Sequence, residues 1–231
     1  MLIPLTQEKV RQLVPLVATG SQYRYVWGKL QDFLRRLTFS VVAVAIVAFG
    51  LNFLGDSTQL VLGLIAGLYW LWAPAVLASF RNRRHRRFPY GGFWRGRVLD
   101  VYVTEELIGK EETVNDKGQL VIIENRERCL NLEIGDKTGF ETRVQAKLLR
   151  QHRGIRPGDA AEMLVLSRRP DLAEIELISE VFLPRHRLWI GTYPILQRDA
   201  FIDLSERLRR KARSQSPKSP RRSPRPRRSS L

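Results

Sequence analysis

Residues 37–80 read LTFSVVAVAIVAFGLNFLGDSTQLVLGLIAGLYWLWAPAVLASF, and this stretch decides how the rest of the chain is placed. It contains two long apolar segments, Leu37 to Gly55 (19 residues without a charge) and Leu60 to Phe80 (21 residues). As helices, both are long enough to cross the roughly 30 Å of hydrocarbon in a bilayer. We therefore predict a transmembrane helical hairpin, with the residues before and after it on the same side of a membrane.

Basic residues stand on both flanks of this stretch. Lys29, Arg35 and Arg36 lie shortly before the first apolar segment, five arginines lie between residues 81 and 87, and the connecting loop carries only Asp56. Positive residues in short loops favour the cytoplasmic side, so both termini are predicted to face the cytoplasm, or the stroma of a thylakoid. The arginines predicted at the membrane surface, near anionic lipid headgroups, are Arg35, Arg36, Arg81, Arg83, Arg84, Arg86 and Arg87.

Small residues recur along one face of each apolar segment, including a G-x-x-x-G pattern in the second. Small side chains let helix backbones approach closely in lipid. These faces are expected to meet inside the hairpin or to contact a partner helix, which leaves a homo-oligomer open. The predicted helix-packing residues are Ala43, Gly50, Gly63 and Gly67. Pro74 removes a backbone donor, which predicts a bend near Trp70.

Residues 1–36 do not resemble a signal peptide, because the apolar run begins only at Leu37. Thr6 could cap a short helix that Pro15 would interrupt, so the first 20 residues are expected to be loosely defined. From Tyr23 to Leu37, apolar residues recur at helical spacing, which is typical of an amphipathic helix lying in the membrane interface. Packing of its first half on the soluble domain is the alternative.

Residues 81–95 form a basic and aromatic neck after the hairpin. Aromatic rings with polar edges favour the membrane interface, so a membrane belt is predicted here, with a ligand-stacking platform as the alternative. The predicted interfacial aromatic residues are Trp27, Phe88, Tyr90, Phe93 and Trp94.

Residues 96–211 change from helical periodicity to alternation of apolar and polar residues, which is typical of half-buried antiparallel strands. The segments 136–139 and 116–118 have the composition of turns between such strands. About six short strands predict a small all-β domain, closed or nearly closed like an OB or SH3 barrel. Asp199 is predicted to start a short helix that carries Phe201, Leu204 and Leu208 on one side.

Residues 212–231 are rich in arginine, serine and proline and lack an apolar core, which predicts a disordered tail. The tail favours contact with anionic headgroups or an acidic protein; a neutral tail and an RNA-binding tail are the alternatives. The formal charge of +16 is unevenly distributed, because residues 88–206 hold 17 basic and 20 acidic groups. The β-domain is therefore mildly acidic, which makes nucleic acid an unfavoured partner.

Residues that could carry chemistry are sparse. The histidines His85, His152 and His186 are far apart, each beside an arginine, without a second ligand at metal spacing. The glycines fit neither the dinucleotide nor the Walker pattern. Cys129 is the single cysteine, which excludes an intramolecular disulfide, and it has no suitably spaced histidine. The sequence predicts no enzyme, no metal site and no cofactor.

The segment RFPYGGFWRGRVLDV, residues 87–101, resembles an uncharacterised two-span membrane-protein family of cyanobacteria with relatives in plastids. The likeness extends over residues 3–28, 67–72, 106–135 and 189–201 and excludes the basic tail. Members are often labelled phosphate ABC transporter permeases. The resemblance implies a thylakoid or plasma-membrane protein of an oxygenic phototroph, and it supplies no catalytic residues.

Three functional hypotheses follow. The first is a non-enzymatic membrane-anchored scaffold, or an assembly or stabilisation factor for a membrane protein complex, which the resemblance implies could be photosynthetic. The second is a subunit of a phosphate permease-like transporter or an oligomeric channel, although the apolar segments offer few polar groups to line a path. The third is a membrane-tethered RNA-binding module, for which the acidic β-domain is unfavourable.

Overall fold

The computed structural model describes residues 1–51, 53, 55–114 and 120–215. Within this range the chain separates into two compact units, one ending at Gln197 and the other starting at Arg198. The second unit contains helix α6, Arg198–Gln215, which begins one residue before Asp199, where the sequence predicts a helix. The predicted turn at residues 116–118 and most of the predicted tail lie outside the described residues.

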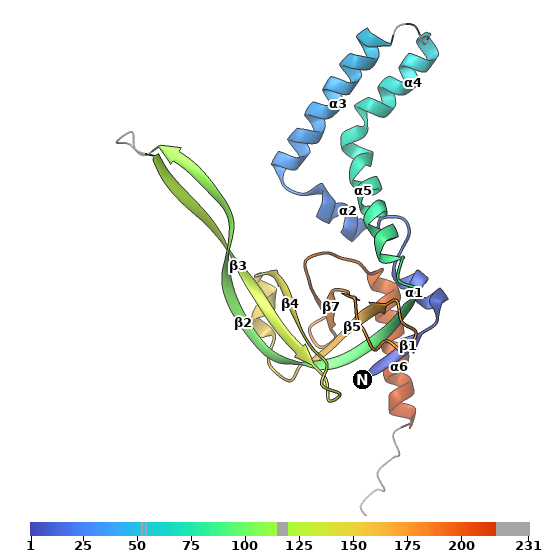
Figure 1. Ribbon diagram of the computed structural model, residues 1–231, viewed down its shortest axis with the longest axis vertical. Coiled ribbons are helices and arrows are strands. Elements are labelled where there is room, and N and C mark those ends of the chain that lie inside the picture. Colours follow the sequence, from blue (N-terminus) through green and yellow to red (C-terminus); the bar gives the residue numbers. More distant parts are fainter. Residues whose placement is uncertain (52, 54, 115–119, 216–231) are drawn as a thin grey trace, which may run out of the picture. The chain divides into compact units, whose positions relative to one another are not determined.

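Helices form the first part of the larger unit (Figure 1). Their bounds are α1 Gln7–Leu13, α2 Gly20–Trp27, α3 Leu30–Gly50, α4 Asp56–Gly67 and α5 Tyr69–His85. Helix α3 lies against α4 and α5, and α2 lies against α5. A short 3-10 helix at Arg150–Gly154 lies in the β-domain.

An eight-stranded antiparallel sheet forms the rest of this unit among the described residues. Its strands are β1 Leu2–Leu5, β2 Tyr90–Val114, β3 Leu120–Gly135, β4 Glu141–Lys147, β5 Ala160–Ser167, β6 Leu177–Ile178, β7 Val181–Leu183 and β8 Leu188–Ile190. The all-β character predicted by the alternation is confirmed. The expectation of uniformly short strands is wrong, because β2 has 25 residues and β3 has 16.

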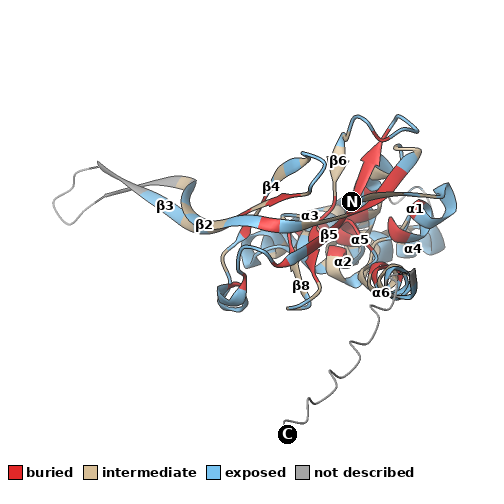
Figure 2. Ribbon diagram, turned by 90° about the horizontal axis from the view of Figure 1, so that it is seen from below, coloured by how far each residue is buried: buried red, intermediate tan, exposed pale blue. Residues whose placement is uncertain are grey.

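The sheet does not close into a hydrogen-bonded barrel among the described strands, and of the two predicted forms, closed or nearly closed, it is the second that it resembles. Its order is β4-β3-β2-β5-β7-β8, so β4 and β8 are the two ends, and no hydrogen-bonded pairing joins them among the described strands. The sheet curls so that these ends approach each other. The core of the domain is formed by the apolar residues Trp94, Val98, Leu130, Leu132, Ile134, Val144, Ala146, Ile155, Ala161, Met163, Val165, Val181, Leu183 and Ile190. Figure 2 shows the buried segments of the sheet in red.

The N-terminal segment is an integral part of this sheet, so the expectation of a loosely defined start is wrong. Strand β1 pairs with β2 over residues 91–94. Helix α1 then buries Val10 and Leu13. A methyl group on Gly91 would lie 2.9 Å from Val10 Cγ2, so only glycine lets α1 approach the sheet this closely. The β-domain therefore includes residues that precede the apolar stretch.

The aromatic neck is also part of the sheet. Phe93 and Trp94 lie in β2 and are almost completely buried, so their predicted place in a membrane belt is wrong. The ring of Trp94 covers Gly96, where a Cβ atom would lie 2.2 Å from the indole. Strand β2 is flanked here by β1 and β5, which turns a sequence typical of an interface into a core segment. Phe88 is half-buried and Tyr90 is exposed.

The helices break at Gly28, which was not predicted, and at Leu68, close to the bend predicted near Trp70. The amphipathic helix expected from Tyr23 to Leu37 is interrupted at Gly28, whose φ is 72°, and continues as α3. The second apolar segment bends by 68° between α4 and α5, with the break at Leu68, two residues before Trp70. Pro74 itself lies inside α5.

One helix, α3, is long and apolar enough to cross a membrane among the described residues. Helices α4 and α5 meet the same criterion only when they are taken together across their bend. The described structure thus contains one candidate membrane-spanning helix near the N-terminus, and a second if the bent pair forms one span.

A pair of buried amides joins the helices to the β-domain. Gln22 Nε2 donates to Asn82 Oδ1 at 2.9 Å, and Asn82 Nδ2 donates to Gln22 Oε1 at 2.8 Å. Gln22 Nε2 also donates to the carbonyl oxygen of Ile195 at 3.2 Å. Both amide side chains are fully buried. These three contacts hold α2, α5 and the segment after β8 together.

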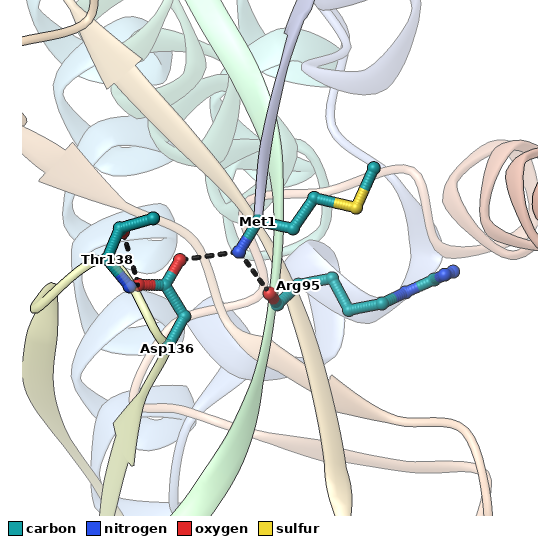
Figure 3. Close-up of polar contacts among 4 residues, drawn as sticks. All are labelled: Met1, Arg95, Asp136 and Thr138. Carbon is teal, nitrogen blue, oxygen red and sulfur yellow. Dashed lines mark hydrogen bonds and ion pairs between the residues drawn. The ribbon is translucent and has the colours of Figure 1, made fainter.

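The turn between β3 and β4 is held by Asp136 (Figure 3). The terminal ammonium of Met1 donates to the Asp136 carboxylate at 2.5 Å and to the carbonyl oxygen of Arg95 at 2.8 Å, and Thr138 N–H donates to the same carboxylate at 2.9 Å. Burial alone raises the pKa of Asp136. The hydrogen bonds from the ammonium and from Thr138 outweigh it and lower the pKa from 3.8 to about 2.

We predict that the buried amides are energetically coupled. Asn82→Ala should lower the free energy of unfolding by about 1–3 kcal/mol, because the buried Gln22 amide loses one donor and one acceptor contact and keeps only those to Ile195 and Thr19. The double variant Gln22→Ala/Asn82→Ala should lose less than the sum of the two single losses. Thermal unfolding of the purified chain measures this. Gln31→Ala, which removes an exposed amide of α3, is the control. Strictly additive losses would contradict the coupling.

Asp136→Asn should change how stability depends on pH. The folded-state pKa of Asp136 is depressed from 3.8 to about 2, so its stabilisation is complete above pH 4 and disappears as the pH falls to about 2. Because Met1 is exposed, we expect a cost of about 1–2 kcal/mol at pH 7 and almost none near pH 2. Urea unfolding at a series of pH values tests this.

The control for that experiment is Asp171→Asn, because Asp171 pairs with Arg169 on the surface, where both side chains are largely exposed. It should change stability little at any pH, since exposed ion pairs contribute at most about 1 kcal/mol. If Asp136→Asn and the wild type lose stability in parallel between pH 4 and pH 2, the assigned role of Asp136 is wrong.

Candidate functional site

Strands β2 and β3 continue as a two-stranded ribbon beyond the rest of the sheet (Figures 1 and 2). Strand β5 pairs with residues 90–97 of β2, and β4 pairs with residues 129–135 of β3. From Glu105, which faces Arg128, to Val114, which faces Leu120, the two strands pair only with each other among the described residues. We call this part, residues 105–114 and 120–128, the ribbon.

The ribbon is long for a structure without a third strand. Its nine register pairs correspond to about 30 Å of extended chain. An isolated two-stranded hairpin is marginally stable in water, because it has no sheet face to bury. The outer edges of both strands also present backbone N–H and C=O groups without a strand neighbour in the described structure, and such edges can pair with another chain. These properties favour a binding element.

Side chains of β4 brace the base of the ribbon. Gln145 donates a hydrogen bond to the carboxylate of Glu106, and Lys147 forms an ion pair with Glu127. A register shift between Leu107 and Gly109 follows directly beyond this base. Such bulges increase the local twist and bend of a strand. The direction of the ribbon is therefore set by β4 and by the bulge.

A second set of contacts joins β2, β3 and β4 just before the ribbon begins. Buried Asn131 donates to Thr104 Oγ1 at 2.7 Å and accepts two hydrogen bonds from the Arg143 guanidinium at 3.0 and 2.7 Å. That guanidinium lies 5.3 Å from the ring centre of Tyr102. Tyr102 donates to Glu133 at 3.1 Å. Desolvation and this carboxylate raise the pKa of Tyr102, which keeps the hydroxyl a donor. This network holds β2, β3 and β4 together where the ribbon starts.

The ribbon segment is acidic. Residues 105–128 contain seven acidic and four basic residues, a net charge of −3 that equals the whole excess of residues 88–206. Glu105, Leu107 and Glu124 are exposed. A partner for this element is therefore expected to present basic groups.

Two of the four predicted helix-packing residues, Gly63 and Gly67, lie at the contact between α3 and α4. A Cβ atom on Gly67 would lie 3.5 Å from Val44 Cγ2, and one on Gly63 would lie 4.0 Å from Val47 Cγ1. Ala43 is half-buried and Gly50 is exposed. The two glycines of α4 thus face α3 within the chain.

Arg36 does not occupy the surface position predicted for it. Its guanidinium is buried and donates to the carbonyl oxygens of Asp32 and Val26 at 3.1 Å each, and to that of Trp27. The break at Gly28 leaves the last carbonyl groups of α2 near α3, and a cation satisfies carbonyl groups at a helix end. Arg36 caps α2, a role that a membrane-surface reading of the charge pattern missed.

Some of the arginines at the end of α5 contact other parts of the protein, and others are exposed to solvent. The Arg81 guanidinium lies 4.5 Å from the ring centre of Tyr193, and Arg86 donates to the carbonyl oxygen of Arg11 at 3.2 Å. Trp27, predicted at the interface, is half-buried, and its ring centre lies 6.0 Å from that of Trp70. The remaining predicted surface arginines are exposed: Arg35, Arg83, Arg84 and Arg87.

The histidines are placed separately in the structure. His152 is buried, which lowers its pKa. His186 Nε2 lies 2.8 Å from the Asp159 carboxylate, a contact that sequence spacing did not reveal. Burial alone raises the pKa of Asp159, but hydrogen bonds from the Arg156 backbone, His186 and Arg185 lower it overall. Within the described residues, no group of three His, Cys, Asp or Glu side chains could hold a metal ion.

Comparison with known proteins places the chain in an uncharacterised family. No curated protein and no solved structure matches it. A family model described as a family of unknown function, DUF8619, matches residues 3–212. This agrees with the expected membership of an uncharacterised family, while a cyanobacterial or plastid origin stays a prediction. The match covers most of the chain, and the protein belongs to the DUF8619 family of unknown function.

Proposed function

We propose that this protein is a non-enzymatic membrane-anchored scaffold, or an assembly or stabilisation factor, whose ribbon docks onto a subunit of a membrane protein complex. The observation that carries the proposal is the ribbon itself. It pairs over nine registers without a third strand among the described residues, while its base is braced by Gln145 and Lys147 of β4. A braced base and unsupported strands are typical of an element that gains its packing from a partner.

The proposed anchor is a two-span hairpin made of α3 and the bent pair α4 and α5. Its support is the outward exposure of large apolar side chains on α3, including Phe39, Val41, Ile46 and Phe49. A contiguous apolar surface of this kind is unfavourable in water, because each Å² costs about 25 cal/mol. Both termini would then face the cytoplasm or stroma, at a thylakoid or plasma membrane.

The backbone edges and the charge of the ribbon indicate which kind of partner it suits. Its strand edges offer backbone groups for pairing with an extended segment, and its acidic excess favours a positively charged one. We therefore propose a membrane-protein subunit that exposes a basic strand or loop on the cytoplasmic or stromal side. Contact between the acidic ribbon and nucleic acid is unfavourable because the phosphate backbone is negative.

Shortening the ribbon should abolish docking and leave the domain folded. Replacing residues 107–126 by Asn-Gly joins Glu106 to Glu127, which face each other in the register, by a tight turn. A photo-crosslinking residue at exposed Leu107 should form an adduct with one membrane subunit, and none should form from exposed Leu149. That subunit should co-purify with the full-length chain tagged after Leu231 and be lost from the shortened chain.

A charge-matched pair provides the control. Glu105→Lys/Glu124→Lys reverses two exposed charges on the ribbon and should weaken capture of the crosslinked subunit about 10-fold or more. Glu141→Lys/Glu174→Lys makes the same change elsewhere on exposed positions and should leave capture unchanged. Docking through the ribbon is refuted if the complex survives ribbon shortening, or if Leu107 yields no adduct.

The orientation of the anchor can be tested by cysteine labelling. In a Cys129→Ser background, a cysteine at Ser57, in the first turn of α4, should react with an impermeant thiol reagent added from outside the cell. A cysteine at Ser214, exposed on α6, should react only after permeabilisation. The reverse pattern would overturn the orientation. Labelling of both sites in intact cells would overturn the two-span anchor.

A further inference from the structure

A pocket of about 340 Å³ lies where the end of α5 meets the β-domain. Arg81 and His85 of α5 form one wall, and Arg143 and Gln145 of β4 form another. The rest of the lining comes from Val144, from residues 177–180 and 191–193, and from Ile195. The volume is at the small end of the range of roughly 300–1,000 Å³ that is typical of small-molecule sites. It could hold a compact polar group with a short substituent.

Two arginines line this pocket, and neither forms an ion pair with a carboxylate among the described residues. The Arg81 guanidinium is held 4.5 Å from the ring centre of Tyr193. The Arg143 guanidinium is held by two hydrogen bonds to Asn131 and by the nearby ring of Tyr102. Aromatic rings and an amide fix each cation in place without neutralising its charge.

Glu180, the acidic residue in the lining, contacts backbone N–H groups. The Glu180 carboxylate accepts the backbone N–H of Ile195 at 2.7 Å and that of Leu196 at 3.3 Å. These hydrogen bonds hold the segment of residues 191–196. Arg81, Arg143 and Glu180 together give the lining a formal charge of +1 when His85 is neutral. Thr192, which is exposed, adds a hydroxyl to the rim.

We propose that this pocket binds the phosphate group of an anionic ligand, with Arg81 and Arg143 as the principal contacts. Guanidinium groups carried by two different elements, α5 and β4, suit a tetrahedral anion, which offers oxygens in several directions, better than a planar carboxylate, which offers two. The phosphate can belong to a lipid headgroup or to a soluble phosphomonoester. Both are recognised by the same two arginines.

The lipid source rests on the proposed membrane anchor. Arg81 directly follows Phe80, the last residue of the second apolar segment. In the proposed orientation this end of α5 lies at the headgroup level of the cytoplasmic or stromal leaflet, where anionic lipid is abundant. A soluble phosphomonoester needs no membrane. If the membrane anchor is wrong, the pocket should still bind glycerol 3-phosphate; if the pocket is wrong, no phosphate probe should bind.

Calorimetric titration of the full chain in neutral detergent tests the site with three probes: dihexanoyl phosphatidylglycerol, glycerol 3-phosphate and inorganic phosphate. Saturable binding is expected for at least one probe. Arg81→Gln and Arg143→Gln should each weaken it about 10-fold, because each removes a charge-assisted contact to phosphate. Arg83→Gln removes the same charge from an exposed position of α5 outside the pocket lining and should change affinity less than about 2-fold.

A second variant protects the test against misfolding, because Arg143 also supports Asn131. Thr192→Glu places a carboxylate at the exposed rim and should abolish binding while the thermal unfolding temperature stays unchanged. Tight binding of the lipid alone assigns the headgroup source, and equally tight binding of glycerol 3-phosphate assigns the soluble source. The proposal is overturned if no probe binds saturably, or if Arg83→Gln weakens binding as much as Arg81→Gln does.

Discussion

The reciprocal amide pair of Gln22 and Asn82 is the constraint on which the arrangement of the larger unit depends. Each amide is buried and gives the other a donor and an acceptor, and Gln22 also donates to Ile195. Buried amides are costly when unpaired, so only one relative placement of α2, α5 and the segment after β8 satisfies them. Because α5 leads from the apolar helices to β2, this placement fixes how the helices leave the β-domain.

Local patterns in the sequence predicted local structure well. Alternation indicated the antiparallel strands, and the residue types of Asp136–Gly139 indicated the turn between β3 and β4. Gly139 adopts a φ of 89° there, a conformation that favours glycine. Contacts distant in sequence were not visible. Residues 2–5 gain their strand from a partner about 90 positions away, and Phe93 and Trp94 are buried because β1 and β5 flank them. The charge pattern predicts Arg36 at the membrane surface. Its actual partners, carbonyl groups of α2, are within reach only because the helix breaks at Gly28.

The candidate sites needed the structure for the same reason. Alternation predicts that a segment is a strand, but it does not reveal how many neighbours the strand has, so the unsupported ribbon could not be distinguished from the central sheet. The pocket combines α5, β4 and the segment around residues 177–195, which no spacing rule connects. The sequence supplied one part of each site: the acidic charge of residues 105–128 and the arginine at the end of the second apolar segment.

The two halves of β2 show why the ribbon is better explained by binding than by stability. Residues 90–97 are flanked by β1 and β5 and contribute to the core, so they supply the burial that orders the strand. Beyond Thr104 the same strand costs conformational entropy and gains only one neighbour in the described structure. The charged residues of the ribbon discourage indiscriminate edge pairing. A domain that needed only stability would gain by ending both strands at Glu106 and Glu127, where β4 stops bracing them. The proposed partner, which would complete the sheet, accounts for the length beyond that point.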